Sequence, residues 1–336
     1  MSFATYGDLA STFQTRHLSA RLKHDMTRLG LELSTGRKAD VATHVAGDFG
    51  PVAGIEHSLK LLVAHAESTA EAAILVSGSQ TVLGNIQEQA QALSGGLLSA
   101  ISSQNVGLIQ STAVDAREKF SSVISSLNTN LGDRTLFAGA ATDGPALADA
   151  NSIMSDLMAA ISAETTAAGV SSQIDDWFKA SGGGFETTGY LGASEELGPF
   201  RLRDGETALQ PIKASDSEIR DLLSALAKSA VIAEGALAGN APAQKQLVTQ
   251  SSNELRAADD QLTLLRARVG GIEARIETAS VRNAAEKSAL ELSYNQLTAA
   301  DPYETATALQ SLYGQMESLY TVTARLSNLN FTDYMR

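Results

Sequence analysis

Cysteine is absent from the 336-residue sequence, and tryptophan occurs once. The lack of cysteine excludes disulfide cross-links, thiolate catalysis and metal sites with cysteine ligands. No apolar run approaches the roughly 20 residues of a membrane-spanning helix, so we expect no membrane insertion. Aromatic residues make up only 5% of the chain, while alanine, serine, leucine and glutamine are abundant. Such a composition fits long packed helices better than a deep globular core.

Basic residues are too few and too scattered for a nucleic-acid partner. The chain has 25 Lys and Arg against 38 Asp and Glu, a net charge of −13, and no strongly basic block. Binding to phosphate groups requires clustered Lys and Arg, so we expect no nucleic-acid binding. The segment Met1 to Tyr6 lacks a basic stretch followed by an apolar core, and we therefore expect no cleaved secretory signal peptide.

The most regular feature present is an apolar seam from Val248 to Leu297. At alternating steps of three and four residues, eleven of its fifteen positions are apolar. A repeat of this length is typical of a coiled coil rather than of an ordinary amphipathic helix. Pro242 suits the first helical turn, and Asp301-Pro302 ends the helix. Residues 242–297 would form a rod about 84 Å long, whose seam needs partners elsewhere in the chain.

Three further long helices are predicted. The first covers Leu9 to Leu33 and ends at Gly36, with a loop over residues 36–50. Pro51 opens the second, which Ser94-Gly95-Gly96 weakens or ends, and the third runs from about Gly107 to Leu131. The predicted seam of the second helix comprises Ile55, Leu59, Leu62, Ala66, Thr69, Ala73, Val76, Gln80, Leu83, Gln87 and Ala90.

A last helix begins at Asp301, with Pro302 in its first turn and Glu304 completing a capping box. The two ends of the chain thus each carry one narrow apolar stripe, and we expect residues 1–35 and 302–330 to pair lengthwise. The residues predicted to serve packing and assembly are Leu18, Leu22, Leu29 and Leu33, the turn residues Gly36 and Arg37, and Leu309, Leu312, Met316, Leu319 and Leu326.

The middle of the sequence has a different character. Residues 153–161 indicate a short helix, and Gly182-Gly183-Gly184 a flexible break. Phe200 to Ala214 predicts a β-hairpin, because Asp204-Gly205 is a strong turn signal between alternating arms. Ser215 to Glu218 has the pattern of a capping box that opens a helix through about residue 237.

These elements predict a mainly α-helical fold. We expect a long antiparallel bundle or coiled coil built from both chain ends, with a small α+β insert that carries the hairpin. The predicted divisions are a terminal helical region (1–50 plus 298–336), a helical rod (51–140 plus 215–297) and the mixed insert (141–214). Polar seam residues such as Asn283, Glu286 and Ser293 would fix the register or mark a change of partner.

No pattern indicates catalysis. His17 and His24 could share a helix face, but no carboxylate or cysteine completes the spacing of a metal site, and surface or interface positions suit the histidines better. Asp175-Asp176 beside Trp177 could form a carbohydrate site, although an interface or a minor core around the tryptophan suits them better. The glycine-rich and serine-containing stretches match no nucleophile-elbow or phosphate-loop motif. We therefore expect no enzyme activity, no cofactor and no metal.

Several short motifs resemble bacterial flagellins and flagellin-like hook-associated proteins. Leu33–Lys38 (Leu-Ser-Thr-Gly-Arg-Lys) resembles the turn that closes their first helix. Arg266–Ile276 resembles their Arg-Ala-x-Leu-Gly-Ala…Asn-Arg-Leu segment, and Ala300–Glu304 the opening of their last helix. Arg134–Thr142 is similar to the Tyr-Leu-Phe-x-Gly-x-x-Thr stretch of the branch found at the hook–filament junction. Residues 85–93 lack the arginine of the motif by which flagellins trigger the animal immune receptor.

The resemblance implies a structural adaptor at the hook–filament junction, located outside the cell and exported through the flagellar type III channel. Implied partners are other copies of the chain, the neighbouring hook-associated protein, flagellin and an export chaperone. A flagellin filament subunit is the alternative within the family. A cytoplasmic coiled-coil signalling or scaffold protein is the alternative of another class, although such a protein would not need the Leu33–Lys38 turn or the hairpin.

Overall fold

The computed structural model describes residues 6–44, 48–103, 105–209 and 212–328, apart from a few side chains near the two ends. The chain divides into two compact units. We call residues 1–62 plus 285–336 the terminal unit, and residues 63–284 the central unit. The sequence-based divisions at 50/51 and 297/298 thus differ from the observed ones, and residues 141–214 form no unit of their own. None of the described helices is long and apolar enough to cross a bilayer.

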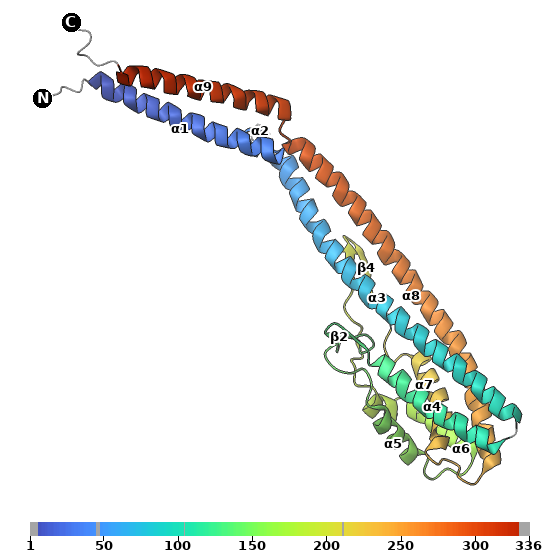
Figure 1. Ribbon diagram of the computed structural model, residues 1–336. Helices are drawn as coiled ribbons and strands as arrows, with labels where there is room; N and C mark the ends of the chain where they lie inside the picture. Colours follow the sequence, from blue (N-terminus) through green and yellow to red (C-terminus); the bar gives the residue numbers. More distant parts are fainter. Residues whose placement is uncertain (1–5, 45–47, 104, 210–211, 329–336) are drawn as a thin grey trace, which may run out of the picture. The chain divides into compact units, whose positions relative to one another are not determined.

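The terminal unit is built around two antiparallel helices from opposite ends of the chain. Helix α1 (Tyr6–Thr35) lies beside α9 (Pro302–Asn328), as Figure 1 shows. The short helix α2 (Val41–His44) lies in the segment that the sequence indicated as a loop. The unit also contains the start of α3 (Gly50–Ser103) and the end of α8 (Ala241–Thr298).

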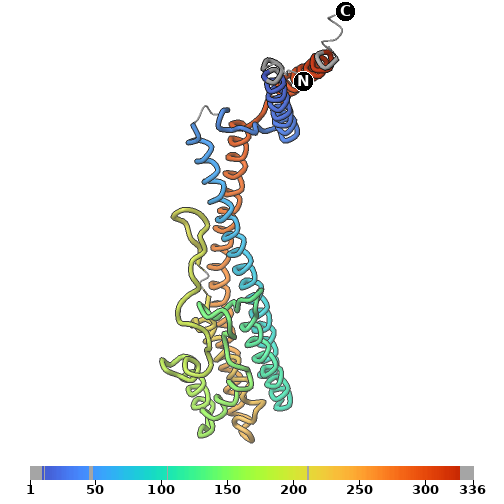
Figure 2. Tube along the Cα trace, turned by 90° about the vertical axis from the view of Figure 1, so that its left-hand side faces the viewer, coloured from blue at the N-terminus to red at the C-terminus, as the bar shows by residue number. Residues whose placement is uncertain are grey.

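The central unit contains the remainder of α3 and α8, which run side by side (Figure 2). Helix α4 (Val106–Leu127) packs along α7 (Ser217–Ala233), and the shorter α5 (Ala150–Ala160) and α6 (Ala167–Lys179) pack near them, followed by the π-helical turn η1 (Phe185–Gly189). One continuous apolar core joins the long helices to this mixed insert, because Leu83, Phe120, Phe178 and Leu262 all belong to it. The predicted mainly α-helical fold with a small hairpin-bearing insert is confirmed.

Two small antiparallel hairpins complete the central unit. Strand β3 (Phe200–Arg203) pairs with β4 (Glu206–Ala208) across the predicted turn, where Gly205 has a φ of +76°. The second hairpin, β1 (Asn130–Leu131) with β2 (Arg134–Thr135), was not predicted, since its strands are only two residues long.

Side chains of α8 hold the β3–β4 hairpin in place. Arg275 Nη2 donates to the carbonyl of Thr207 over 3.1 Å, and Arg282 Nη2 donates to Glu206 Oε2 over 2.5 Å. The seam residue Asn283 is buried and donates to the carbonyl of Leu202 over 2.8 Å. This polar seam position therefore marks a change of partner, as expected, from a helix to a strand.

The predicted seam of α8 is confirmed from Val248 to Asn283, where every position is buried except the half-buried Ile272. The seam predicted for α3 has the right period, but alternate positions were placed one residue too late. The buried series includes His65, Ala72, Ser79 and Ile86, instead of Ala66, Ala73, Gln80 and Gln87, although Gln87 is also buried. Ala72 and Ala73 suit either register, whereas Ile86 beside Gln87 favoured the observed one.

Three local predictions are wrong for identifiable reasons. Helix α3 continues through Gly95-Gly96 to Ser103, because Leu93, Leu97 and Ala100 are buried on one face and outweigh a glycine cost of about 1 kcal/mol each. The predicted capping box over Ser215–Glu218 does not form, because the N-cap residue of α7 is Asp216 and its side chain bonds no helix N–H. The Asp216 Oδ2 instead accepts a 2.9 Å hydrogen bond from the Lys213 N–H, although α7 begins where expected.

The third correction concerns Gly182-Gly183-Gly184, which is a close contact rather than a flexible break. A Cβ atom on Gly184 would overlap the indole ring of Trp177. Trp177 and Phe178 on α6 are buried together with Phe185, their rings in edge-to-face or tilted contact. The glycine is therefore required by packing around the single tryptophan.

Candidate assembly surface on the terminal helices

Helices α1 and α9 meet along a short apolar seam. On α1 the buried positions are Leu22 and Leu29, with Met26 half-buried between them. On α9 Met316 is buried, and Leu309, Leu312 and Leu319 are half-buried at alternating steps of three and four. A fully buried leucine or methionine side chain contributes roughly 1.5–3 kcal/mol, and only three of these positions are fully buried. The pair is therefore thinly stabilised within one chain.

The structure separates the predicted residues into two groups. Leu22, Leu29, Leu309, Leu312, Met316 and Leu319 face the seam between α1 and α9. Leu18 and Leu33 are 48% and 41% exposed. Leu326 lies in α9, but its side chain is outside the described residues. Exposed leucines on a helix pair are available to another molecule.

The turn after α1 is tied to the junction between α8 and α9. Gly36 has a φ of +69°, which a residue with a Cβ rarely adopts, and its N–H donates to the Glu32 carbonyl over 2.8 Å. The Lys38 N–H donates to the Thr298 carbonyl over 2.9 Å, and the Ala300 N–H donates to the Gly36 carbonyl over 3.0 Å. These bonds hold the end of α1 next to the start of α9.

Arg37 reinforces the same connection through its side chain. Its Nη2 donates to Asn295 Oδ1 over 2.8 Å, and its guanidinium carbon lies 5.4 Å from the centre of the Tyr294 ring. The Tyr294 hydroxyl donates to Glu56 Oε1 over 3.0 Å, and this hydrogen bond is the main reason why the pKa of Tyr294 is raised. Arg37 thus anchors the turn instead of pointing freely into solvent.

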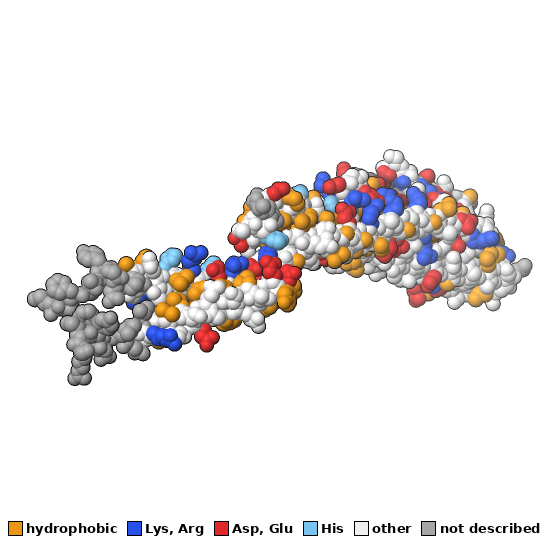
Figure 3. All heavy atoms as spheres, turned by 90° about the horizontal axis from the view of Figure 1, so that it is seen from above, with side chains coloured by type: hydrophobic (Ala, Val, Ile, Leu, Met, Phe, Trp, Pro, Cys, Tyr) orange, Lys and Arg blue, Asp and Glu red, His pale blue; other side chains and the backbone are white. Residues whose placement is uncertain are grey.

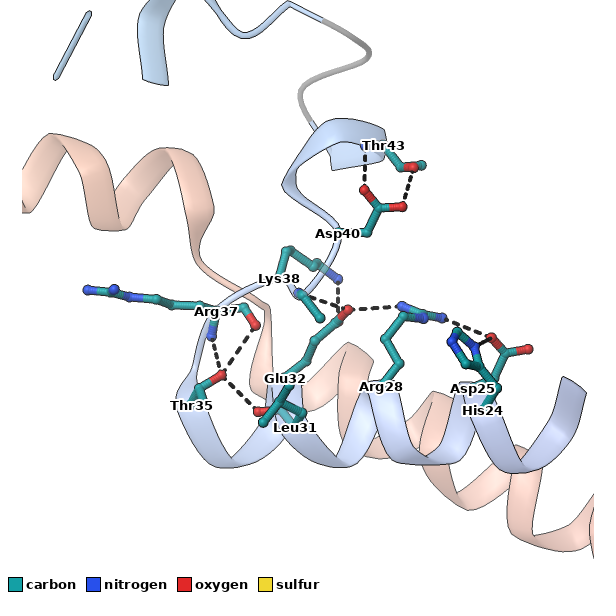
Figure 4. A network of polar contacts seen from close by, with 11 residues as sticks. His24, Asp25, Arg28, Leu31, Glu32, Thr35, Arg37, Lys38, Asp40 and Thr43 are labelled. Carbon is teal, nitrogen blue, oxygen red and sulfur yellow. Dashed lines mark hydrogen bonds and ion pairs between the residues drawn. The ribbon is translucent and has the colours of Figure 1, made fainter. Parts of the chain in front are cut away.

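A buried carboxylate organises the segment that follows α1 (Figure 4). Glu32 is buried; its Oε1 accepts hydrogen bonds from Arg28 Nη1 at 2.9 Å and from the Ala39 N–H at 3.2 Å. Lys38 Nζ lies 3.7 Å from Oε2 of the same residue. The sequence reasoning missed Glu32, although the spacing of four residues from Arg28 was a signal for an ion pair on one helix face.

Asp40 holds the start of α2 in the same region. Its carboxylate accepts hydrogen bonds from the Thr43 Oγ1, at 2.7 Å, and from the Thr43 N–H, at 3.1 Å. These bonds keep the pKa of Asp40 below its ordinary value. Residues 38–43 are therefore positioned by side-chain contacts, which supports a defined position for the end of α1.

Exposed apolar side chains are frequent on both terminal helices. Hydrophobic side chains gather on the visible face of the pair in Figure 3. Apolar side chains that gather on a surface are suited to contact with another protein. The large exposed apolar residues on α1 and α9 are Phe13, Leu18, Leu31, Leu33, Tyr303, Tyr313, Tyr320 and Val322.

Asp175, in the acidic pair beside Trp177, makes its contacts within the fold. Its carboxylate accepts hydrogen bonds from Lys228 Nζ at 2.6 Å and Ser224 Oγ at 2.8 Å, and Lys179 Nζ lies 2.8 Å away. Across the described residues, no group of three or more His, Asp or Glu side chains is arranged to hold a metal ion. The terminal helices therefore carry the strongest candidate surface.

Comparison with known protein families gives a match at the C-terminal end of the described helices. Residues 252–335, about a quarter of the chain, match the family described as the bacterial flagellin C-terminal helical region. The match contains all of α9 and most of α8. No curated protein sequence matches the chain.

Two solved structures share the fold. The crystal structure of FlgL from Bacillus cereus aligns with a TM-score of 0.50 and 16% identity, covering 70% of this chain and 96% of that protein. A protein of Vibrio parahaemolyticus described as a flagellar hook-associated protein aligns with a TM-score of 0.50 and 12% identity, covering 73% of this chain and 95% of that one. The C-terminal quarter of the chain is thus similar to flagellins, and the chain shares its fold with the structure of FlgL, hook-associated protein 3.

Proposed function

We propose that this protein is a structural component of the bacterial flagellum that serves as an adaptor at the hook–filament junction. The observation that carries the proposal is the pairing of α1 with α9, which brings both ends of the chain together and leaves apolar side chains exposed on the pair. The flagellin-like C-terminal region and the FlgL-like fold support the flagellar setting.

In this role copies of the chain pack side by side through their terminal helices. Each copy presents different faces to its two neighbours, and such heterologous contacts propagate around a tubular wall instead of closing as a dimer. One edge of the layer meets the neighbouring hook-associated protein, and the other meets flagellin. The chain reaches this place by type III export with the help of a chaperone, without a cleaved signal peptide, and works outside the cell.

Deletion of the gene tests this function. We expect cells with hooks but without filaments, and with flagellin released into the medium, because filament subunits would lack their adaptor. A plasmid copy of the wild-type gene should restore filaments. Normal filaments in the deletion strain would contradict the proposal.

The match to the flagellin C-terminal region also favours a second candidate, a filament subunit. A filament protein polymerises on itself without limit, whereas an adaptor forms a limited layer. We expect the purified protein not to elongate filament seeds, even at high salt. Long filaments made of this protein alone would favour the filament subunit.

A cytoplasmic coiled-coil scaffold is the candidate from another class. The exposed helix faces alone would suit it, but nothing in that role requires the flagellin-like region at residues 252–335. Fractionation separates the two: the adaptor is recovered with sheared flagella, and the scaffold stays with the cell body.

A further inference from the structure

An exposed carboxylate in the β3–β4 hairpin turn lies beside a buried imidazole. Oδ1 of Asp204 lies 3.7 Å from Nε2 of His65 on α3. The Asp204 side chain is 83% exposed and can rotate, whereas His65 is buried and holds its position. A small rotation of the carboxylate therefore brings it within hydrogen-bond reach of the imidazole, which is the requirement for a proton transfer between the two groups.

The next amide in the chain is available as a nucleophile. Gly205 lies outside both strands of the hairpin, and no described residue accepts a hydrogen bond from its N–H. A Cβ atom built on Gly205 would meet no atom within 4 Å, so the turn is not crowded. Glycine also leaves the backbone freer to rotate than any other residue does. The Gly205 nitrogen can therefore approach Cγ of Asp204.

Charged residues on either side of the turn are already positioned. Glu206, which follows the turn, pairs with Arg282 of α8, and Arg203 precedes the turn. Asp204 is thus the carboxylate that lies within ion-pair distance of His65 in the described structure. The anchored flanks allow the two turn residues to rearrange while the hairpin stays in place.

We propose that Asp204 converts spontaneously to isoaspartate, with His65 as the proton donor. The Gly205 nitrogen attacks Cγ of Asp204 and closes a succinimide ring, while the bond from Cγ to Oδ1 breaks. The oxygen leaves as water, with one proton from the His65 imidazolium and one from the amide. Histidine changes its charge between about pH 5 and 8, so imidazolium is present near neutral pH.

Hydrolysis of the ring completes the modification. Water adds to one of the two ring carbonyls and opens the ring, and the carboxylic acid that forms returns a proton to the imidazole. Opening at the side-chain carbonyl restores aspartate. Opening at the main-chain carbonyl gives isoaspartate, which adds one methylene to the main chain of the turn. Because only water is needed, the modified fraction rises with the age of the protein.

The chain contains one other Asp-Gly pair, Asp143-Gly144, which serves as an internal control. Asp143 is also exposed, but its neighbours are held by Thr135. The Thr135 N–H donates to the Thr142 carbonyl over 2.9 Å, and Thr135 Oγ1 donates to the Gly144 carbonyl over 2.6 Å. All five histidines lie in the first 65 residues, and in the described structure none of them pairs with Asp143.

Incubation of the purified full-length protein at about pH 6, where imidazolium is populated, tests the proposal. Protease digestion and mass spectrometry with electron-transfer fragmentation then measure isoaspartate at both sites. We expect it to accumulate severalfold faster at Asp204 than at Asp143. Asp204→Glu keeps the carboxylate but requires a larger ring that closes more slowly, and it should abolish the signal at this site alone. Equal accumulation at both sites, or none at Asp204, would overturn the proposal.

His65→Gln tests the proton donor. We expect the rate at Asp204, divided by the rate at Asp143 in the same sample, to fall severalfold, with the circular dichroism spectrum unchanged. A merely structural role of His65 predicts the reverse, because loss of its contact would loosen the turn and speed ring closure. A ratio equal to or above that of the wild type would therefore overturn the assignment of His65.

Discussion

Lys228 Nζ lies 2.6 Å from Oδ2 of Asp175, and no part of the lysine side chain is exposed to solvent. The same ammonium group lies 2.5 Å from Oε2 of Glu254. The three residues belong to α7, α6 and α8 respectively, so one buried cation connects the mixed insert to the long helices. The folded central unit therefore depends on the pairing of the buried Lys228 ammonium group with these two carboxylates.

Substitution of this lysine should destabilise the protein strongly. We expect Lys228→Ala to lower the free energy of unfolding by about 3–5 kcal/mol, because two carboxylates lose their common buried partner. Urea denaturation followed by circular dichroism measures the change. Lys119→Ala is the control: Lys119 makes a half-buried pair with Asp115 at 3.7 Å, four residues apart on one helix and worth roughly 0.5 kcal/mol. Similar losses for both variants would contradict the role of Lys228.

Asp175 should make stability fall in acid. Burial pushes its pKa up, but hydrogen bonds from Lys179, Lys228 and Ser224 outweigh burial and leave the pKa below its ordinary value. The stabilisation is complete above the unfolded pKa of about 3.9 and is lost as pH falls through the lower folded value. Below about pH 5, the unfolding free energy of the wild type should therefore fall more steeply than that of Asp175→Asn. Parallel curves would contradict this.

Asp216 should give the opposite pH dependence of the unfolding free energy. Burial is the main reason why its pKa is raised. Its contribution is present below the unfolded pKa of about 3.9 and is lost as pH rises through the higher folded value. The stability difference between wild type and Asp216→Asn should therefore decrease with rising pH, whereas the difference for Asp175→Asn increases. Urea denaturation across the acid range measures both.

Gly184→Ala should disturb the only tryptophan. The new Cβ would overlap the Trp177 ring, which must then move out of its packed position. We expect a loss of about 1–3 kcal/mol in unfolding free energy and a red shift of tryptophan emission. Gly198→Ala is the control, because no atom lies within 4 Å of a Cβ built there. Unchanged emission from Gly184→Ala would show that the Trp177 ring tolerates the added Cβ atom, and would contradict the prediction.

The free monomer should be cut first in its terminal helices. A seam with few fully buried residues stabilises α1 and α9 only weakly, and isolated helices are marginal in water. We expect limited proteolysis to cleave within α1 and α9 before residues 63–284, and assembly into flagella to protect both helices. If the monomer's terminal helices resist protease as well as the central unit does, ordering is not coupled to assembly.

The sequence predicted most where one pattern dominated. The seam of α8 and the Asp204-Gly205 turn followed directly from a strict repeat and a strong turn signal. The seam of α3 was ambiguous because alanines flank it, and burial selected His65 over Ala66. Gly95 and Gly184 carried misleading signals, since the packing that decides their role comes from residues distant in the sequence.

The candidate surface could be predicted only in part. The spacing of apolar residues predicted the stripes of α1 and α9. It did not predict which of these leucines are buried within a single chain. Leu22 faces α9 and is buried by the chain. Leu18 is exposed because it precedes a position of α1 that faces α9 by one residue. The spacing of Glu32 from Arg28 was a signal for an ion pair, but the hydrogen bond that Glu32 accepts from the Ala39 backbone N–H is one that no residue pattern reveals.

The most direct measurement of the central claim is the position of the protein in the flagellum. Asp204 lies in the hairpin turn with a side chain that is 83% exposed, and Asp204→Cys would be the only cysteine in the chain. Electron microscopy of flagella labelled at this thiol with gold should show one narrow band between hook and filament. Label along the whole filament, or no band at the junction on flagella from a strain that makes the Asp204→Cys variant, would contradict an adaptor at the junction.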